Sequence, residues 1–392
     1  MTRLRWTTAG ESHGPALIGV LEGVPAGLAL DVERIDRELV RRQGGYGRGG
    51  RMKIERDHVE VLSGIKGGLT IGSPIALRVP NRDATIEKLP TPTNPRPGHA
   101  DLAGCQKFGI HDPRAVLERA SARETAIRVA LAGVARQILE AFGIEVFAHL
   151  VGLGSVTVAP DAFERAGDAA ARAALRAASD FMSLDPDADS RMREQVDEAK
   201  ASGDSLGGVF EVRAIGVVPG LGSYASGPER MTARIGGALF SIPAMKGVEF
   251  GLGFESARRP GSEVHDPILP APTGADRAGA GQPSWGRFQR DSNRAGGLEG
   301  GVTNGEPLVV RVAMKPIPTL RQGIDTVDFA TGEAVRATYQ RSDVTSVPAA
   351  SVVGEAMVAL TLAEAFVEKF GGDSMEQVSG AFAAYRAQLA AL

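Results

Sequence analysis

Apolar residues recur at helical spacing in a short segment near the start of the chain. Within residues 31–43, Val32, Ile35 and Leu39 fall on one face of a helix. Asp31 stands where an N-cap is expected, and Gly44 follows the last helical position. The pattern predicts an amphipathic helix that begins after Asp31 and ends at Gly44.

Two longer helical patterns lie further along the chain. From about Ala122 to Phe142 apolar residues follow one stripe, and Ser121 and Glu124 before it have the spacing of a capping box. Residues 348–370 are apolar almost all round. Because a helix that is hydrophobic on every side is typical of a protein core, we expect this second helix to lie buried between layers.

The remaining pattern consists of strands, surface helices and one long loop. Residues 58–65 and 73–79 are rich in β-branched and apolar positions and are predicted to be strands. Residues 162–200 are rich in alanine and charge, which favours peripheral helices. Residues 259–297 are rich in Gly, Pro, Arg and Asp, and a long irregular stretch in a compact chain is usually a functional loop.

The chain contains an internal repeat. The segment GGLTIGSPIALRV at 67–79 matches GGVTNGEPLVVRV at 300–312 at most positions without a gap. Before each of them lies a second matching pair, GESHGPALIGVLEGVPAGL from Gly10 and GDSLGGVFEVRAIGVVPGL from Gly203. The repeat predicts one domain, residues 1–392, built of two similar halves at about 1–150 and 200–392. Antiparallel strands with buried helices then indicate a layered α+β fold with pseudo-twofold symmetry.

Composition narrows the class of protein. The chain has 392 residues, is 43% hydrophobic and 23% charged, and carries a formal net charge of −3. It is too apolar to be a disordered arginine-glycine tail, and it lacks the positive excess of a nucleic-acid-binding protein. The single cysteine, Cys105, excludes a disulfide framework and a cysteine metal cluster, and no metal is predicted. With no signal peptide and no stretch resembling a membrane span, a soluble cytoplasmic protein is expected.

Two histidines are candidates for chemistry. The repeat places His13 opposite Leu206, so the turn and strand that follow can form without a histidine at this point. A purely structural role for His13 is therefore less favoured. His99 lies in a Pro-Gly turn that leads into a helix and has no counterpart in the other half. The context of the remaining four histidines favours a structural role; they are His58, His111, His149 and His265.

Arginines indicate a local binding site for anions. Arg48 and Arg51 lie in the glycine-rich segment QGGYGRGGRM, where the backbone can approach a ligand closely and guanidinium groups can bind phosphate or carboxylate. Arg41 and Arg42 fit the last turn of a helix, so a solvated helix end is the default for either alone. Helix N-termini also bind anions, and symmetry can place both long-helix starts at one site. Further candidates near turns and helix starts are Arg96, Arg119, Arg123, Arg341, Ser342 and Asp343.

At these residues the chain resembles the chorismate synthase family. The resemblance spans almost the whole chain and rests on several motifs in the family's order, none of which would suffice alone. They are GESHG, RRQGGYGRGGRMKIE, PRPGHADL, ERASARETAIRVA, SIPAMKGVEFGLGFE, SNRAGGLEGGVTNG, MKPIPTL and RSDVTSVPAA.

The resemblance implies a carbon-oxygen lyase of the shikimate pathway. It would convert 5-enolpyruvylshikimate 3-phosphate to chorismate and phosphate by 1,4-elimination, and it would need reduced FMN without net redox change. The implied fold is a β-α-β sandwich in a homotetramer. The implied partners are the small-molecule substrate and a separate flavin reductase, with NADPH as an indirect reductant and no nucleic acid or membrane.

The resemblance also implies roles for individual residues. His13 and His99 would be acids, one near the leaving phosphate and one near the flavin, and Asp343 would be the base that acts at flavin N5. Substrate anions would be bound by Arg42, Arg48, Arg51, Arg96, Arg123 and Arg341. Flavin contacts would come from Arg119, Ala120, Ser121, Pro243, Ala244, Gly300, Lys315, Pro316, Ile317, Pro318, Thr319 and Arg341.

Two other classes remain as minor alternatives. An RNA-binding module would have more arginine-glycine repeats with interleaved aromatic residues, whereas only Tyr46 lies in the glycine-rich segment. A conventional flavin or nicotinamide oxidoreductase would have a glycine fingerprint between a strand and a helix of a βαβ unit, a pattern that we do not find.

Overall fold

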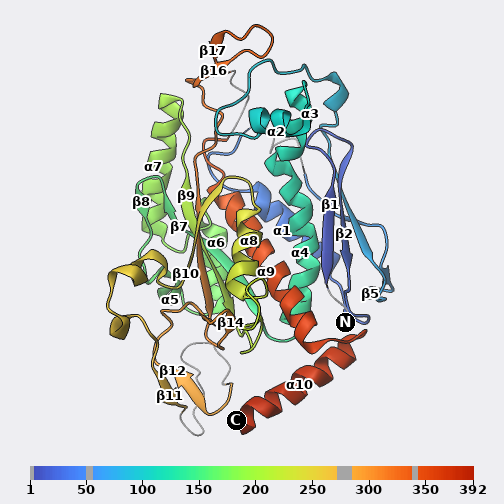
Figure 1. The fold of residues 1–392 in the computed structure, drawn as a ribbon, viewed down its shortest axis with the longest axis vertical. Helices are drawn as coiled ribbons and strands as arrows, with labels where there is room; N and C mark the ends of the chain where they lie inside the picture. Colours follow the sequence, from blue (N-terminus) through green and yellow to red (C-terminus); the bar gives the residue numbers. More distant parts are fainter. Residues whose placement is uncertain (1–3, 50–55, 272–284, 338–342) are drawn as a thin grey trace.

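Two larger antiparallel sheets, several two-stranded hairpins and a set of helices make up the described part of the molecule (Figure 1). The computed structural model describes residues 4–49, 56–271, 285–337 and 343–392. The first sheet has the order β1-β2-β6-β3. Its strands are β1 (Arg5–Ala9), β2 (Ala16–Glu22), β6 (Ile75–Pro80) and β3 (Glu60–Val61). The predicted α+β class with antiparallel strands is confirmed.

The second sheet has the order β10-β15-β9-β7-β8. Its strands are β10 (Met245–Phe250), β15 (Leu308–Met314), β9 (Gly208–Ile215), β7 (Glu145–Leu153) and β8 (Val156–Thr157). Since β7 pairs with β9, this strand belongs to the second sheet. The predicted first half, which extends to about residue 150, thus includes the start of a strand of the second sheet.

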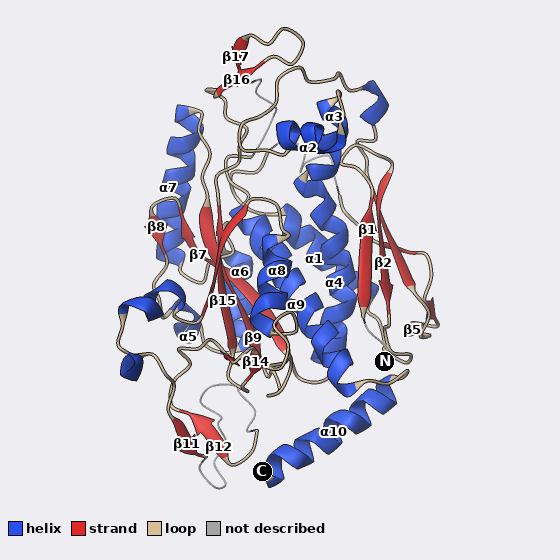
Figure 2. Cartoon of the chain, viewed as in Figure 1, coloured by secondary structure: helices blue, strands red, loops and turns tan. Residues whose placement is uncertain are grey.

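Helices lie between the two larger sheets (Figure 2). They are α1 (Val32–Gln43), α4 (Thr125–Glu140), α8 (Met231–Phe240) and α9 (Val347–Phe370). Helix α4 packs on β2 and β6, α9 packs on β7 and β9, and the two helices pack against each other. Packing is close enough that a Cβ added at Gly354 of α9 would lie 2.2 Å from the ring of Phe210 on β9. This layer buries the main hydrophobic core between the sheets.

The sequence predicted the boundaries of α1 closely and those of α4 less closely. Helix α1 is capped by Asp31, whose side chain accepts a hydrogen bond from Arg34 N, and it ends at Gly44. The predicted start at Ala122 becomes a short 3₁₀ turn, η3 (Ala122–Glu124), before α4. Ser121 caps this turn through Arg123 N, but the Glu124 carboxylate accepts hydrogen bonds from Arg128 and Thr8. Because the Glu124 carboxylate binds these two side chains, the predicted capping box does not form.

Helix α9 is the buried helix that the sequence predicted. By length and composition it could cross a membrane, so the expectation that no stretch resembles a membrane span is wrong on those two criteria. However, 94% of its most apolar window is buried inside the protein. The helix is apolar all round because protein surrounds it on every side.

Matching segments of the sequence repeat form matching pairs of strands. In the first sheet Leu17 faces Val79, and in the second sheet the aligned residues Phe210 and Val312 face each other. The next aligned pairs, Ile18 with Arg78 and Glu211 with Arg311, keep the same register. The two sheets therefore share one backbone arrangement although many of their side chains differ.

In each half a buried threonine makes two hydrogen bonds to the backbone of the aligned loop. Thr70 Oγ1 donates to Pro25 O (2.6 Å) and accepts from Leu28 N (3.0 Å). Thr303 Oγ1, at the aligned position, donates to Val218 O (2.7 Å) and accepts from Leu221 N (2.8 Å). These threonines belong to the small hairpins β4 (Ile65–Lys66) with β5 (Leu69–Thr70), and β13 (Leu298–Glu299) with β14 (Val302–Thr303).

The other elements lie around these layers. Residues 162–200 form the predicted peripheral helices α5 (Ala162–Arg165), α6 (Ala169–Ala178) and α7 (Pro186–Ser202). The predicted strand at 73–79 is β6, whereas 58–65 holds only β3 and the start of β4. The rest are α2 (Asp101–Phe108), α3 (Pro113–Ala120), α10 (Met375–Ala391), η2 (Ile86–Lys88), η4 (Gly253–Arg258), η5 (Gly261–Glu263), β11 (Ile268–Pro270), β12 (Phe288–Arg290), β16 (Asp325–Val327) and β17 (Ala334–Arg336).

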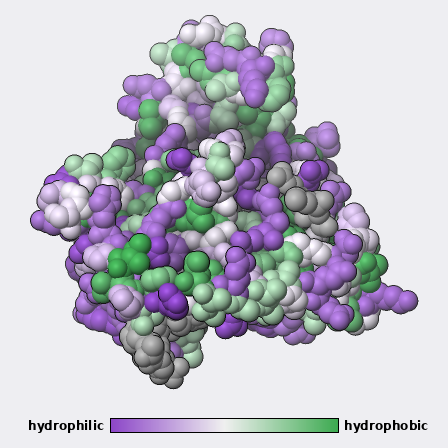
Figure 3. All heavy atoms as spheres, turned by 60° about the horizontal axis from the view of Figure 1, so that its bottom comes forward, coloured by the Kyte–Doolittle hydropathy of each residue, from purple (hydrophilic) through white to green (hydrophobic). Residues whose placement is uncertain are grey.

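One end of the molecule carries exposed apolar side chains. Phe254 of η4 is 70% exposed, and Ile268 and Phe288 of the β11–β12 hairpin are 61% and 50% exposed. Figure 3 brings this end forward and shows hydrophobic residues in separate groups among hydrophilic ones.

Candidate active site

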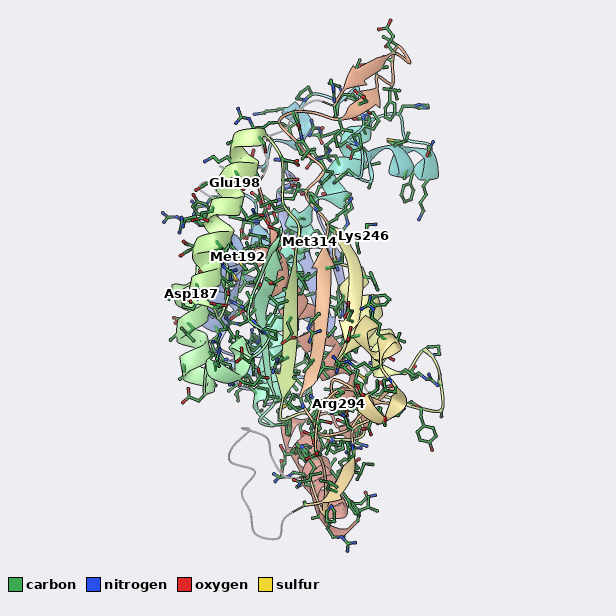
Figure 4. The ribbon with its side chains drawn as sticks, turned by 90° about the vertical axis from the view of Figure 1, so that its left-hand side faces the viewer. Asp187, Met192, Glu198, Lys246, Arg294 and Met314 are labelled. Atoms are coloured by element: carbon green, nitrogen blue, oxygen red, sulfur yellow. The ribbon has the colours of Figure 1, made fainter. Side chains whose placement is uncertain are left out.

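A cavity of about 950 Å³ lies where α4 and α9 begin. Five segments form most of its wall: the turn before β2, the loop before α2, the turn from α3 to α4, the turn from α8 to β10, and the chain after β15. Figure 4 shows Lys246 and Met314 close together at the ends of β10 and β15, where both line the cavity. The two long-helix starts thus meet at one site.

The cavity is basic although the chain is slightly acidic overall. Among the described residues, the carboxylates in its wall are Glu124 and Asp343. The cationic side chains in its wall are more numerous: Arg96, Arg114, Arg119, Arg128, Lys246 and Lys315. Such a wall favours ligands that carry several negative charges.

His13 lines the cavity with its ring fixed from behind. Its Nδ1 lies 2.9 Å from Oε2 and 3.0 Å from Oε1 of Glu118, and its backbone N–H donates to Oε2 (2.8 Å). Nε2 lies 3.7 Å from Asp83 Oδ2. Burial acts to raise the pKa of Glu118, but the hydrogen bonds from His13 and the charges of His13 and Arg114 outweigh it, so this pKa is lowered. Glu118 is thus a charged acceptor at neutral pH.

His99 has a similar arrangement. Its Nδ1 lies 2.5 Å from Asp101 Oδ1, and Arg96 donates from Nε to Asp101 Oδ2 (2.8 Å). Burial acts to raise the pKa of Asp101, but hydrogen bonds from His99 and Arg96 together with their charges lower it well below its usual range. Asp101 and His99 are neighbours at the start of α2, so the local turn itself brings them together.

Asp343 is held at the start of α9 by three donors. Gly49 N and Ser346 Oγ each donate to one of its oxygens at 2.5 Å, and Arg48 Nη1 lies 2.6 Å from Oδ2. Arg48 lines a second cavity of about 670 Å³. Asp343 and Thr319 line both cavities, so the two spaces adjoin.

The opposite wall is built from the turn after α8 and the chain after β15. Ala244 has φ of +71°, a conformation that is rare for a residue with a side chain, and its carbonyl accepts from Lys315 N (3.0 Å). Lys315 Nζ donates to Gly98 O, which joins this wall to the loop of His99. Burial, and then the charge of Lys246, lower the pKa of Lys315. Strained backbone of this kind is often found at functional sites.

Comparisons with known proteins identify the family of this chain. The family model described as chorismate synthase matches residues 4–367. A chorismate synthase of Desulforudis audaxviator is 52% identical over 387 residues, covering 96% of this chain and 95% of the relative. The chain belongs to the chorismate synthase family. A chorismate synthase of Trichlorobacter lovleyi is 51% identical, with 96% of each chain covered. A crystal structure of a chorismate synthase covers 100% of this chain and 99% of its own, with 42% identity and a TM-score of 0.78.

Many of the site residues that the chorismate synthase resemblance implies lie together at the large cavity. Those that line it are His13, Arg96, His99, Arg119, Ala120, Ser121, Pro243, Ala244, Lys315, Ile317, Pro318, Thr319 and Asp343. Pro316 lies between two residues of this wall, and Arg48 lines the adjoining cavity. Arg51 and Arg341 lie outside the described residues.

Arg42 and Arg123 lie behind the cavity wall. Arg123 Nη1 contacts both oxygens of Asp57 at 2.6 and 2.7 Å, and its Nε donates to Asn81. Arg42 donates to Thr125 Oγ1 (3.0 Å) and to Ala122 O (2.7 Å). Burial lowers the pKa of Arg42 to about 10, so it stays charged at neutral pH. The two arginines therefore stabilise the start of α4 from the side away from the cavity. Neither of their side chains lines the cavity.

Two further predicted site segments, Gly300 and residues 259–297, do not line the cavities in their described part. Gly300 lies in the tight β13–β14 turn, which does not line either cavity in this chain. The described part of 259–297, predicted to be a functional loop, contributes no residue to either cavity. It forms η5 and the β11–β12 hairpin instead.

Sequence reasoning missed the two carboxylates behind the histidines. Asp101 offered a signal, since it follows His99 by two residues within one motif. Glu118 begins the motif ERASARETAIRVA, but nothing in that motif links it to His13, because 105 positions of chain separate the two residues. The wall residues Ser12, Arg128, Lys246 and Ser346 were also not singled out.

Proposed function

We propose that the large cavity catalyses the reaction of the chorismate synthase family in this chain, the conversion of 5-enolpyruvylshikimate 3-phosphate to chorismate and phosphate. This is a carbon-oxygen lyase reaction of the shikimate pathway, which supplies the aromatic amino acids. The observation that carries the proposal is that His13, His99 and Asp343 line one basic cavity at two helix starts. A substrate with a phosphate and two carboxylates matches this charge.

The residues at the cavity fit reduced FMN. The lysines Lys246 and Lys315 suit its phosphate, while apolar side chains such as Ile317 and Met314 suit a flat ring. Reduced flavin would supply the electron density that the elimination needs and would recover it, so no net redox change results. Residues proposed to hold it are Arg119, Ala120, Ser121, Pro243, Ala244, Lys315, Pro316, Ile317, Pro318, Thr319 and Arg341. Gly300 would take part only from another chain of an assembly, since it is remote from this cavity.

Arginines from the loops would bind the substrate anions. Arg96 lines the large cavity and Arg48 lines the adjoining one, and Arg51 and Arg341 are proposed to join them. Arg42 and Arg123 would contribute through their charge and by holding the start of α4. In this proposal Arg48, Arg51, Arg96 and Arg341 touch the substrate, whereas Arg42 and Arg123 act from behind the cavity wall.

The histidines would donate protons and Asp343 would accept one. In both histidines Nδ1 faces a carboxylate, so Nε2 is the nitrogen proposed to exchange a proton. Asp83 Oδ2 lies 3.7 Å from Nε2 of His13, and Arg96 Nη2 lies 3.4 Å from Nε2 of His99. One histidine would protonate the leaving phosphate and the other would act near the flavin. The Asp343 carboxylate, held by Gly49 and Ser346, is placed to serve as the base.

We infer that the two halves form one pseudo-twofold domain that arose by duplication, a β-α-β sandwich with helices between its sheets. The shared strand register and the paired threonines at 70 and 303 support this origin. A homotetramer is proposed because exposed apolar side chains such as Phe254 and Ile268 would be covered in an assembly. A cytoplasmic location, a separate flavin reductase and NADPH as indirect reductant complete the proposal.

An anaerobic assay tests the proposed function. The protein is mixed with the enolpyruvyl substrate and with either reduced or oxidised FMN, and the release of phosphate is followed with the absorbance of chorismate. We expect both products in equal amounts and only with reduced FMN. No phosphate release under reducing conditions would contradict the proposal.

A further inference from the structure

Glu118 holds His13 by three contacts from one buried carboxylate. Its oxygens lie 2.9 and 3.0 Å from Nδ1, and one of them also accepts the backbone N–H of His13. The Glu118 side chain is 0% exposed, and Arg114 Nη1 lies 3.4 Å behind it. On the other side of the ring Asp83 Oδ2 is 3.7 Å from Nε2, so no other charged group in the described contacts faces Nδ1.

We propose that Glu118 is a positioning residue for His13, fixing the neutral ring as the Nδ1–H tautomer with Nε2 turned to the cavity. The inference rests on the proposed role of His13 as a proton donor. A carboxylate can only accept hydrogen bonds, so a neutral ring beside it must carry its proton on Nδ1. The added bond from the backbone N–H fixes the carboxylate relative to the ring, which prevents a turn that would withdraw Nε2.

The same arrangement recurs at the second histidine. His99 Nδ1 faces Asp101, and Arg96 contacts that carboxylate as Arg114 contacts Glu118. Arg96 Nη2 also lies 3.0 Å from His99 Nδ1, a contact that Arg114 does not make in the described contacts of His13. Two segments far apart in the chain therefore each place a carboxylate against Nδ1 of a histidine at the wall of one cavity. A role only in packing would not require Nδ1 to be the contact atom in both.

Glu118→Gln tests the tautomer directly. The glutamine keeps the size of the side chain, and its oxygen can still accept the backbone N–H of His13. Its amide then presents N–H to the ring, so Nδ1 becomes an acceptor and the proton moves to Nε2. With ¹⁵N-labelled histidine at alkaline pH, we expect the Nδ1–H tautomer for His13 in the wild type and the Nε2–H tautomer in the variant. Loss of one signal set in His13→Leu identifies the ring.

Turnover provides the second measurement. A catalytic histidine in the wrong tautomer is a poor proton carrier, so we expect Glu118→Gln to lower kcat by roughly 10²-fold or more while KM changes little. The matched control is Glu211→Gln. Glu211 is also buried beside a histidine, with its Oε1 3.4 Å from His149 Nε2, but it does not line either cavity. This control should leave the His13 signals and the turnover of folded enzyme unchanged.

The outcomes separate positioning from packing. A wild-type His13 in the Nε2–H form overturns the inference and needs no variant, so it can be tested even if Glu118→Gln folds poorly. A Glu118→Gln variant with unchanged tautomer and normal kcat also overturns it. Because the tautomer is measured without substrate or flavin, this result is independent of whether the protein releases phosphate.

Discussion

The two halves of the molecule share a backbone but not their chemistry. Strands β2 and β6 pair in the register of β9 and β15, and Thr70 and Thr303 make the same two hydrogen bonds. At the turn that enters this shared frame, one half has His13 on a buried carboxylate and the other has Leu206, packed against the core. The backbone pattern therefore does not need the histidine, which supports the proposed role of His13 in the reaction.

The helix starts differ in the same way. Ser121 precedes α4 and Asp343 precedes α9 at equal distances from the first helical residue, and both line the cavity. Ser121 caps its own turn, whereas Asp343 is held by the loop of Arg48 and by Ser346. One half supplies a neutral hydroxyl where the other supplies a carboxylate, so a symmetric frame forms an asymmetric site.

The largest expected effect on turnover comes from replacing His13 with leucine, the residue that the second half has at the aligned position 206. His13→Leu should keep the fold, because Leu206 occupies the aligned turn, and should lower kcat by roughly 10²- to 10⁴-fold, the range for loss of a general acid. Circular dichroism and phosphate release measure the two effects. A folded variant with normal turnover would show that His13 is not the acid.

Asp343→Asn removes the carboxylate that has no counterpart in the first half. Asparagine has a similar size and can still accept from Gly49 N, so we expect kcat to fall by roughly 10²-fold with KM nearly unchanged. Steady-state kinetics with saturating reduced FMN measure the split. If substrate affinity fell strongly and kcat were kept, Asp343 would be a binding residue instead of a base.

Arg48→Ala should weaken substrate binding with little effect on reduced FMN. One lost charge-assisted contact is worth about 1.5 to 3 kcal/mol, which corresponds to roughly 10- to 100-fold in affinity. Anaerobic calorimetry with each ligand measures both affinities, and a mixed-sequence RNA serves as the comparison ligand. RNA binding that depends on Arg48, together with unchanged substrate affinity, would support the RNA-binding alternative for this loop.

Substitutions at Thr70 and Thr303 test whether the two halves share one backbone arrangement. Thr70→Val and Thr303→Val each leave a buried N–H and carbonyl without their partner, so each should reduce the free energy of unfolding by about 1 to 3 kcal/mol. Urea denaturation measures this, with the exposed Thr157→Val expected to change it by less than about 0.5 kcal/mol. A large loss in one half and none in the other would argue against equivalent roles.

The smallest effect concerns acid stability in the second half, where Glu211 aligns with Ile18. Burial acts to raise the pKa of Glu211, but His149 and Arg213 outweigh it and lower the pKa from 4.5 to about 2. A depressed pKa stabilises the fold above pH 4.5, and this contribution is lost as the pH falls from 4.5 to about 2. Glu211→Gln should therefore lose less stability than the wild type between pH 5 and 3, which acid titration of unfolding measures. An identical acid dependence would contradict this assignment.

The sequence was most informative where the pattern is local. Helix α1 follows from its cap and its apolar face, and the burial of α9 follows from its apolar residues on all sides. The family motifs pointed to His13, His99 and Asp343, which meet at the cavity. Each of these signals is contained within a few turns of chain.

The sequence was less informative where distant segments meet. Arg42 has the pattern of a solvated helix end, yet the start of α4 covers it. Arg123 resembles a ligand-binding arginine, yet the loop residue Asp57 takes its guanidinium. Glu118 shows no pattern that links it to His13. Burial and long-range pairing depend on the packing of whole elements, which a single sequence does not display.

The central claim is that the asymmetric side chains of a symmetric frame bind and convert one substrate in the cavity between the helix starts. An anaerobic crystal structure with reduced FMN and the enolpyruvyl substrate tests this most directly. We expect both ligands in the 950 Å³ cavity, with His13 Nε2 within hydrogen-bond distance of one of them. Ligands bound elsewhere, with His13 and Asp343 both out of reach, would contradict the claim.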